Sequence, residues 1–328
     1  CFIYQKYYYE LKKNCKGKEK FKKSFPTVNI HTNNLGLRVS KKTVQKYKGK
    51  ENIFIFGDSF TYGTGLEFED SYVGLIEKKL IDYNVYNFGV SSYSPSVYLY
   101  KLNEALRIGL KPKKIIISLD LSDVLDEANR WVYNSTKNKI KTKISEENNH
   151  FKNDSFKQRN FKILGEFASI LNFNLRIIKS KFSNAFNKEQ KPPKIMKIFQ
   201  ASFTYKEIKE LNKDYWKQGD LEIGLKKIET VFKKIENLSN KYGSELYLVI
   251  YPWAETLQFG QEAYSWSEFA SYLCKKDNCK LIDAIPKFEE YKRKNLNWNN
   301  ELYFLNDVNF NKYGSKLLYQ TIINEISN

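Results

Sequence analysis

The sequence has few metal-ligating side chains and no long apolar run. Its 328 residues include only two histidines, His31 and His150, and four cysteines. A structural zinc site takes four such ligands, so we expect neither a metal nor a cofactor. No stretch approaches the roughly eighteen apolar residues that a membrane span requires, and no signal peptide with a charged start and an apolar centre is present. The chain as given is therefore expected to be soluble.

Acidic residues are scarce relative to basic ones. The 55 Lys and Arg residues exceed the 37 Asp and Glu residues, which gives a formal charge of +18. Such a charge suits an acidic partner, for example nucleic acid, anionic lipid or an acidic polysaccharide. The lysines are scattered and form no single basic block, as on a solvated surface. We therefore expect no specific nucleic-acid partner.

The start of the chain admits three interpretations. It begins with Cys1 and Phe2, and the cluster Tyr7-Tyr8-Tyr9 follows. Because tyrosine favours the membrane interface, the cluster is a candidate for the outer edge of a membrane anchor that lies outside this chain. Alternatively, Cys1 is the lipid-bearing first residue of a lipoprotein. The third interpretation is an arbitrary starting point, and no pattern indicates an oligomeric state.

Cys274 and Cys279 lie close together in the sequence. The segment between them contains Asp277 and Asn278, a pair that favours a turn. This spacing predicts a small disulfide loop, which is typical of an oxidising compartment. Two free thiols would instead indicate the cytosol.

Five short apolar runs predict a parallel sheet. Apolar residues make up 41% of the chain, enough for a full core. The runs alternate with segments of helical spacing, a pattern that implies parallel strands joined by right-handed crossovers. The predicted strands are 53–56, 85–88, 114–119, 245–251 and 280–282, and the predicted helices are 71–80, 95–110, 221–241 and 312–326.

The remaining segments are less regular. Residues 1–50 are Lys-rich and poorly periodic, and we interpret them as an N-terminal lead-in segment with a loop at 33–38. Residues 51–328 are expected to form one α/β domain. An insertion or cap at about 127–219 interrupts it, with weakly amphipathic segments such as 161–186. There is no internal repeat.

Residues 57–63 read Gly-Asp-Ser-Phe-Thr-Tyr-Gly and directly follow the first predicted strand. Ligands of open α/β sheets bind beyond the carboxyl ends of such strands, which is where Ser59 lies. The string resembles the first block of the SGNH/GDSL hydrolase superfamily, whose members include esterases, lipases, thioesterases, carbohydrate deacetylases and O-acyltransferases. The resemblance implies a three-layer α/β/α sandwich with a five-stranded, flavodoxin-like parallel sheet, and a catalytic role for Ser59.

A serine nucleophile needs a base within hydrogen-bond reach and a group that orients the base. In the superfamily both lie just before the last helix. The resemblance makes Asp307 the orienting acid and puts Asn309 at the histidine position. The superfamily's other spacing would put Asn306 at the acid position and still leave Asn309 at the base. A carboxamide takes up no proton near neutral pH, so Asn309 is not a general base.

Other residues are alternatives for these roles. His31 or His150 could be brought to Ser59 by folding. Asp123 or Glu127 could also take over as the base. Asp307, in turn, could simply cap the last helix.

The resemblance also assigns an oxyanion hole. The superfamily uses the backbone N–H of the nucleophile, a Gly N–H in the second block and an Asn side chain in the third. In this chain the second block spans residues 87–95 and has Ser92 at the Gly position, and the third spans 120–123 and has Ser122 at the Asn position. The implied donors are therefore Ser59, Ser92 and Ser122.

Three further residues are predicted to contact substrate: Asp58, Asp123 and Trp253. Trp253, with Trp266, would offer a flat aromatic platform to a sugar ring. Each has a structural alternative. Asp58 could hydrogen-bond the turn after the first strand, Asp123 could belong to a charged helix start, and the tryptophans could pack in the core.

These motifs resemble those of cell-surface polysaccharide O-acetyltransferases and esterases. The resemblance implies an SGNH-type ester hydrolase or O-acyl (acetyl) transferase that acts on a cell-envelope glycan through an acyl-serine intermediate. Its partner would be an acylated carbohydrate or another ester, and its location the periplasm or cell envelope. Because the histidine is lost, a noncatalytic glycan-binding module is the alternative. A nucleic-acid binder would rest on charge alone.

Overall fold

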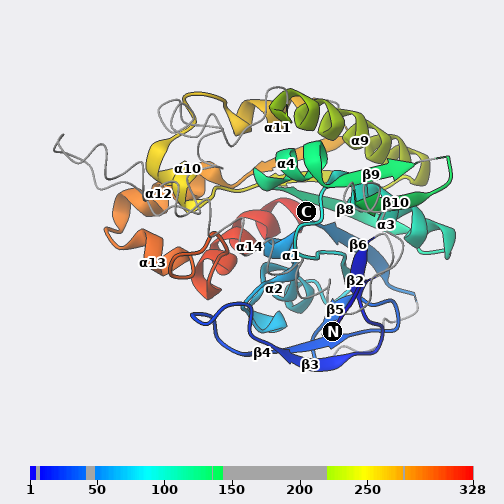
Figure 1. Cartoon of the computed structure of the whole chain (residues 1–328), viewed down its shortest axis with the longest axis horizontal. Helices are drawn as coiled ribbons and strands as arrows, with labels where there is room; N and C mark the ends of the chain where they lie inside the picture. The colour runs from blue at the N-terminus through cyan, green and yellow to red at the C-terminus, as the bar shows by residue number, and fades with distance from the viewer. Residues whose placement is uncertain (5–7, 42–48, 135, 143–219, 276–277, 328) are drawn as a thin grey trace, which may run out of the picture.

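The core of the protein is a five-stranded, all-parallel sheet (Figure 1). The structure is a computed structural model, and it describes all residues except 5–7, 42–48, 135, 143–219, 276–277 and 328. The strand order β12-β11-β8-β6-β7 is the flavodoxin-like order, which confirms the predicted fold class. The strands are β6 (Glu51–Phe56), β7 (Tyr83–Asn87), β8 (Pro112–Leu119), β11 (Glu245–Ile250) and β12 (Cys279–Asp283).

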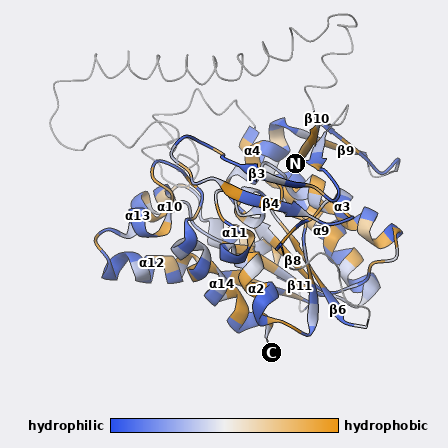
Figure 2. Cartoon of the chain, turned by 90° about the horizontal axis from the view of Figure 1, so that it is seen from below, coloured by the Kyte–Doolittle hydropathy of each residue, from blue (hydrophilic) through white to orange (hydrophobic). Residues whose placement is uncertain are grey.

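The apolar runs are continuous because both faces of the sheet are buried. In β6, Phe54 and Phe56 belong to one apolar cluster, while Ile53 and Ile55 belong to the other. Successive side chains of a strand point to opposite faces, so each strand must be apolar at every position. Figure 2 shows this arrangement, with apolar strands at the centre and polar outer helix faces.

Two helical layers cover the sheet. One layer consists of α3 (Pro95–Arg107), α4 (Ser122–Asn129), α9 (Asp220–Tyr242) and α11 (Trp266–Leu273). The other consists of α1 (Ser59–Tyr62), α2 (Tyr72–Lys79), α10 (Ala254–Phe259), α12 (Ile285–Lys294), α13 (Trp298–Leu302) and α14 (Lys312–Ile326), with a short 3-10 helix at Phe68–Asp70. The four predicted helices are all present.

The N-terminal segment is more ordered than predicted. Strands β1 (Phe2–Tyr4) and β2 (Tyr9–Leu11) form one antiparallel pair, and β3 (Lys16–Glu19), β4 (Val28–Thr32) and β5 (Arg38–Val39) form a three-stranded sheet. The loop expected at 33–38 is the turn between β4 and β5. These strands are short, and in β4 buried Val28 and Ile30 alternate with exposed Asn29.

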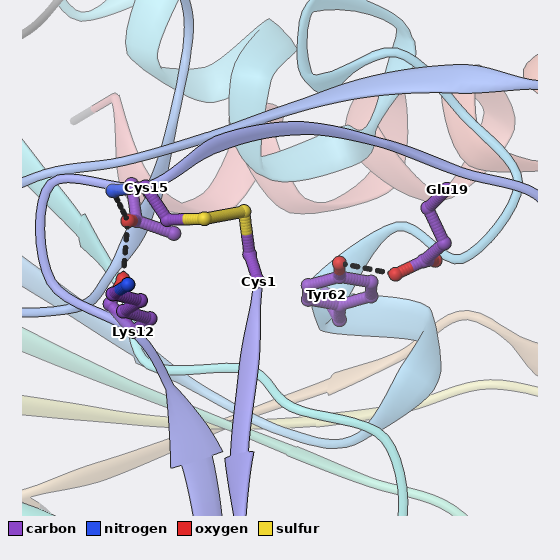
Figure 3. The surroundings of a disulfide bond; sticks show 6 residues. Cys1, Lys12, Cys15, Glu19 and Tyr62 are labelled. Atoms are coloured by element: carbon purple, nitrogen blue, oxygen red, sulfur yellow. Dashed lines mark hydrogen bonds between the residues drawn. A yellow bond between two sulfur atoms is a disulfide. The ribbon is translucent and has the colours of Figure 1, made fainter.

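One interpretation of the chain's start needs correction, and the membrane anchor stays a prediction. Tyr9 packs against the fold, and its hydroxyl donates to the Ser91 carbonyl at 2.7 Å. The Cys1 sulfur forms a disulfide with Cys15 (Figure 3), which uses the atom that a lipid would need. No described helix is both long and apolar enough to cross a membrane.

The remaining predictions about segments have mixed outcomes. The disulfide between Cys274 and Cys279 is present, as predicted. The segment predicted as an insertion begins inside α4 and continues as a hairpin of β9 (Trp131–Asn134) and β10 (Lys139–Thr142). Its remainder, including 161–186, lies outside the described residues.

Candidate active site

Ser59 is the first residue of α1 and lies just beyond the carboxyl end of β6. Asp58 caps this helix, because its carboxylate accepts a hydrogen bond from the Phe60 N–H at 3.0 Å. Between Gly57 and Leu66 every residue is buried except Ser59, which is partly exposed. β6 lies between β7 and β8, where the strand order reverses, and ligands of such sheets bind at this point.

The second block packs directly on α1. The Asn87 amide donates to the Thr61 carbonyl at 3.0 Å and accepts from the Gly89 N–H at 2.9 Å. A Cβ at Gly89 would lie 2.6 Å from the Tyr62 nitrogen, so the two backbones approach more closely than any other residue would allow. Ser92 has φ of 59°, in the left-handed region that favours glycine, the residue the superfamily has there. Its N–H as an oxyanion donor stays a prediction.

The third block does not present Ser122 as an oxyanion donor. The Ser122 hydroxyl and N–H both donate to the Asp120 carboxylate, the N–H at 2.7 Å. Trp253 Nε1 donates to the other carboxylate oxygen at 2.8 Å. The prediction that the Ser122 hydroxyl is an oxyanion donor is therefore wrong in this structure. Asp120, at the position where the superfamily has Gly, accepts the hydrogen bond from that hydroxyl.

Asp58 and Asp120 form a buried, hydrogen-bonded pair of carboxyl groups. Burial raises the pKa of both, and repulsion between the two groups raises the pKa of Asp58 further. The hydrogen bonds from Ser122 and Trp253 favour the charged form of Asp120 and so oppose the rise in its pKa. Instead of facing a substrate, as predicted, Asp58 lies inside the protein.

The Ser59 hydroxyl is in weak contact with this pair. It donates to Asp58 Oδ2 at 3.4 Å, a long hydrogen bond, and no other partner is found for it among the described residues. The site therefore contains one carboxyl group next to the nucleophile, and burial raises the pKa of that group.

The carboxyl groups of α4 serve the fold. Asp123 is fully buried and accepts hydrogen bonds from the Asp120 N–H at 3.0 Å and the Tyr98 hydroxyl at 3.2 Å. Burial and nearby acids raise its pKa well above the ordinary value. Glu127 is fully buried as well and accepts from the Ser96 N–H and hydroxyl, each at 2.7 Å. The predicted substrate contact of Asp123 is thus wrong, and neither group faces Ser59 as a base.

The fifth block has the geometry of an acid and an oriented partner. Asn309 Nδ2 donates to Asp307 Oδ1 at 2.7 Å, and the Asn309 backbone N–H donates to the same oxygen at 2.9 Å. Both residues are buried. Helix α14 is capped by Asn311, which accepts from the Tyr313 N–H at 2.8 Å. Asp307 therefore orients Asn309 and does not cap the helix.

The Asn309 carboxamide has one unused atom. Its Oδ1 is buried and has no hydrogen-bond partner within the part of the chain that the structure describes. Its orientation is assigned by the network, because a flipped amide would set this oxygen against the Asp307 carboxylate. The Phe60 and Phe310 rings, next to Ser59 and Asn309 in sequence, pack edge to face with centroids 4.8 Å apart. The first and fifth blocks therefore meet at the same edge of the sheet.

The structure adds one charged residue that the sequence did not suggest. Lys22, between β3 and β4, forms an ion pair with Asp307 Oδ2. The pairing spans 285 positions, and no local pattern signals it. Of the alternative bases, His31 lies on β4 and makes no side-chain hydrogen bond to a described residue, and His150 lies outside the described residues.

The predicted aromatic platform is wrong. Trp253 is 5% exposed and Trp266 1% exposed, so neither presents a flat face to a sugar. They belong to the two different apolar clusters on opposite faces of the sheet. Both tryptophans are core residues, and Trp253 also holds Asp120.

A groove among the described residues lies away from this site. A groove of about 610 Å³ runs between α3, α9 and the β9–β10 hairpin, and Asn103, Tyr133 and Lys234 are among its lining residues. None of the block residues lines it. No group of three or more described His, Cys, Asp or Glu side chains is placed to hold a metal ion.

Comparisons with known proteins found similar solved structures only. No family model matches the chain, and no curated protein matches it. Among solved structures, a member of the lipolytic G-D-S-L family from Veillonella parvula is similar, with 10% identity, a TM-score of 0.48, and coverage of 85% of this chain and 99% of that one. A catalytic mutant of Axe2, an acetylxylan esterase from Geobacillus stearothermophilus, has 11% identity, a TM-score of 0.44, and coverage of 86% and 96%.

At this identity the likeness concerns the fold alone. The sheet order and the positions of Ser59 and Asp307 come from the chain itself. The sheet order, with helices on both faces of the sheet, gives this protein a three-layer α/β/α fold.

Proposed function

We propose that this protein is an SGNH-type ester hydrolase or O-acyltransferase that acts on an acylated carbohydrate of the cell envelope, with Ser59 as the nucleophile. The observation that carries the proposal is the position of Ser59. It is the partly exposed residue of an otherwise buried block, at the helix start beyond the first core strand.

The chemistry would proceed through an acyl-serine. Ser59 Oγ attacks the ester carbonyl carbon, the hydroxyl proton passes to an acceptor, and the C–O bond to the sugar breaks as the sugar oxygen takes up a proton. Water or a second hydroxyl then receives the acyl group. The backbone N–H groups of Ser59 and Ser92 are the proposed oxyanion donors. With Asn309 at the histidine position, the one described group that accepts a hydrogen bond from the Ser59 hydroxyl is Asp58, and burial raises the pKa of that carboxyl group.

The disulfides support the proposed location of the substrate. Both cysteine pairs, Cys1–Cys15 and Cys274–Cys279, are bonded. Structural disulfides persist in oxidising compartments, which supports a place outside the cytoplasm. An acylated glycan of the cell envelope would lie in such a compartment.

A noncatalytic glycan-binding module is the second candidate, and one observation favours it. The buried Oδ1 of Asn309 has no donor among the described residues, and it lies on the loop whose Phe310 packs against Phe60, the neighbour of Ser59. A sugar hydroxyl, unlike an ester carbonyl, would supply that donor.

One experiment separates the two candidates. A chemically acetylated oligosaccharide is incubated with the protein, and acetate release and calorimetric binding are both measured. An esterase releases acetate, and Ser59→Ala abolishes the release. The matched control is Ser267→Ala, at a partly exposed serine of α11, which should leave release unchanged. Binding without release would favour the module, and neither binding nor release would contradict both candidates.

A further inference from the structure

We propose that Lys22 is a positioning residue of the candidate site, which fixes Asp307 and thereby the group at position 309. This inference rests on the proposed function only in taking the site around Ser59 as the functional one. It adds to that site a residue from the N-terminal segment, far from the superfamily's motif blocks in sequence.

Both oxygens of the Asp307 carboxylate are hydrogen-bonded. Its Oδ1 accepts both donors of Asn309, the backbone N–H at 2.9 Å and the amide Nδ2 at 2.7 Å. Its Oδ2 accepts the Lys22 ammonium. The Asp307 side chain is 3% exposed, whereas that of Lys22 is 37% exposed. A nearly buried carboxylate needs a charged partner, and Lys22 supplies it while keeping contact with water.

Lys22 is also held next to the loop that carries Asp307 by its neighbour Phe25. Phe25, three residues after Lys22, is 3% exposed and packs on Phe304 with ring centroids 4.3 Å apart. Phe304 in turn accepts from the Asp307 N–H and donates to the Asn309 carbonyl, each at 3.0 Å. Lys22 and Phe25 therefore contact the loop that carries Asp307 and Asn309 at two points.

The same segment also contacts α1, the helix that begins with Ser59. The Tyr62 hydroxyl of α1 donates to Glu19 at 2.9 Å. A Cβ at Gly65, just after α1, would lie 2.3 Å from the Phe25 ring, so this loop and Phe25 are in close contact. Residues 19–25 therefore bridge the Ser59 block and the Asp307 block.

The segment is itself held firmly. The disulfide between Cys1 and Cys15 closes just before β3, and the Cys15 N–H donates to Thr32 of β4 at 2.8 Å. Figure 3 shows the disulfide beside the contact between Tyr62 and Glu19. The disulfide and this hydrogen bond therefore hold the segment that leads to Lys22, whose ammonium group binds Asp307.

These contacts indicate what Lys22 does. In the superfamily's arrangement, the acid's partner becomes a cation when it takes the proton from serine. Asn309 stays neutral, so the positive charge beside Asp307 comes from Lys22 instead. Lys22 acts through Asp307 and is not itself assigned a step in the reaction.

The test places a titrating group at position 309. The variant Asn309→His is prepared with Lys22 intact and also combined with Lys22→Met, Lys22→Arg or Lys23→Met, and the introduced imidazole is titrated by NMR. Lys23 is the exposed neighbour of Lys22 and serves as the matched control. Loss of the Lys22 charge should raise the pKa of the imidazole by about 0.5 to 1 unit, because a nearby cation disfavours the protonated form.

The variants distinguish charge from packing. Lys22→Arg should keep the imidazole pKa within a few tenths of a unit, and so should Lys23→Met, whereas only Lys22→Met shifts it. An equal pKa in all four proteins would overturn the proposal, as would a shift with Lys22→Arg as large as that with Lys22→Met. Thermal melts confirm that each protein is folded. The titration needs no turnover, so its outcome is independent of whether Ser59 proves catalytic.

Discussion

The Asn309 amide donates to the Asp307 carboxylate at 2.7 Å, the contact that an orienting acid makes with a histidine ring nitrogen. The protein thus keeps the pairing of the fifth block but has a side chain there that cannot take up a proton. This relationship makes the base the first point to test.

We expect Asn309→His to increase Ser59-dependent hydrolysis of p-nitrophenyl acetate by about 100-fold or more, because a positioned general base contributes 10²- to 10⁴-fold. Asn309→Gln lengthens the side chain, as His does, but adds no base, so it should not increase the rate of hydrolysis. Nitrophenolate release measures both. Equal rates for the two variants would mean that position 309 does not face the serine.

Asp126 should make stability fall as pH rises. Burial raises its pKa to about 7, against the opposing effect of Arg130. The folded protein therefore holds a proton that the unfolded chain releases, so the stabilisation is complete below about pH 4 and lost as pH rises through 7. Asp126→Asn should flatten this dependence.

Urea denaturation at pH 5 and pH 8 measures this effect. The stability difference between parent and Asp126→Asn should change by about 2 kcal/mol between the two pH values, in favour of the variant at pH 8. Asp82→Asn, at an exposed position, is the control and should track the parent. If the stability difference between the parent and Asp126→Asn were the same at pH 5 and pH 8, that result would contradict the raised pKa assigned to Asp126.

The two disulfides should stabilise the protein to different extents. Cys1 and Cys15 are 14 positions apart, whereas Cys274 and Cys279 are 5 apart. On the chain-entropy account, replacing the first pair by serines should cost about 3 kcal/mol and replacing the second about 2 kcal/mol. Equilibrium unfolding of the two double variants compares them directly. A larger loss for the shorter loop would argue against this account.

Arg38 should be essential for the loop after Ser59. Its fully buried guanidinium donates to the carbonyls of Tyr62 and Gly63, each at 2.7 Å, and also to that of Leu66. Arg38→Lys keeps a charge but cannot make this fork, so we expect a loss of about 2 to 4 kcal/mol in the free energy of unfolding. Arg107→Lys, on the surface, should cost less than about 0.5 kcal/mol. Similar losses for both would contradict the role given to Arg38.

The sheet was predictable because its signal is local. Strands buried on both faces are short apolar runs, and β6, β8 and β11 each lie where such a run occurs. Glycine and polar residues after the runs also marked the correct edge of the sheet for Ser59 and Asp307. Burial of Asp123 and Trp253 was not predictable, because the sequence does not say which polar or amphipathic side chains find partners inside.

The N-terminal contribution was missed for a different reason. Its strands have two to five residues, too few to establish an alternating pattern among the lysines. The contacts that matter are long-range: Lys22 pairs with Asp307, and Arg38 binds the loop after α1. Such pairings are set by tertiary packing, which no spacing within 1–50 encodes.

The most direct test of the central claim is the intact mass of the parent protein after incubation with p-nitrophenyl acetate, followed by peptide mapping. We predict one added acetyl group on Ser59, slow to form and absent in Ser59→Ala. A parent protein that stays unmodified while Ser59 remains unlabelled in Asn309→His as well would contradict the assignment of Ser59 as the nucleophile.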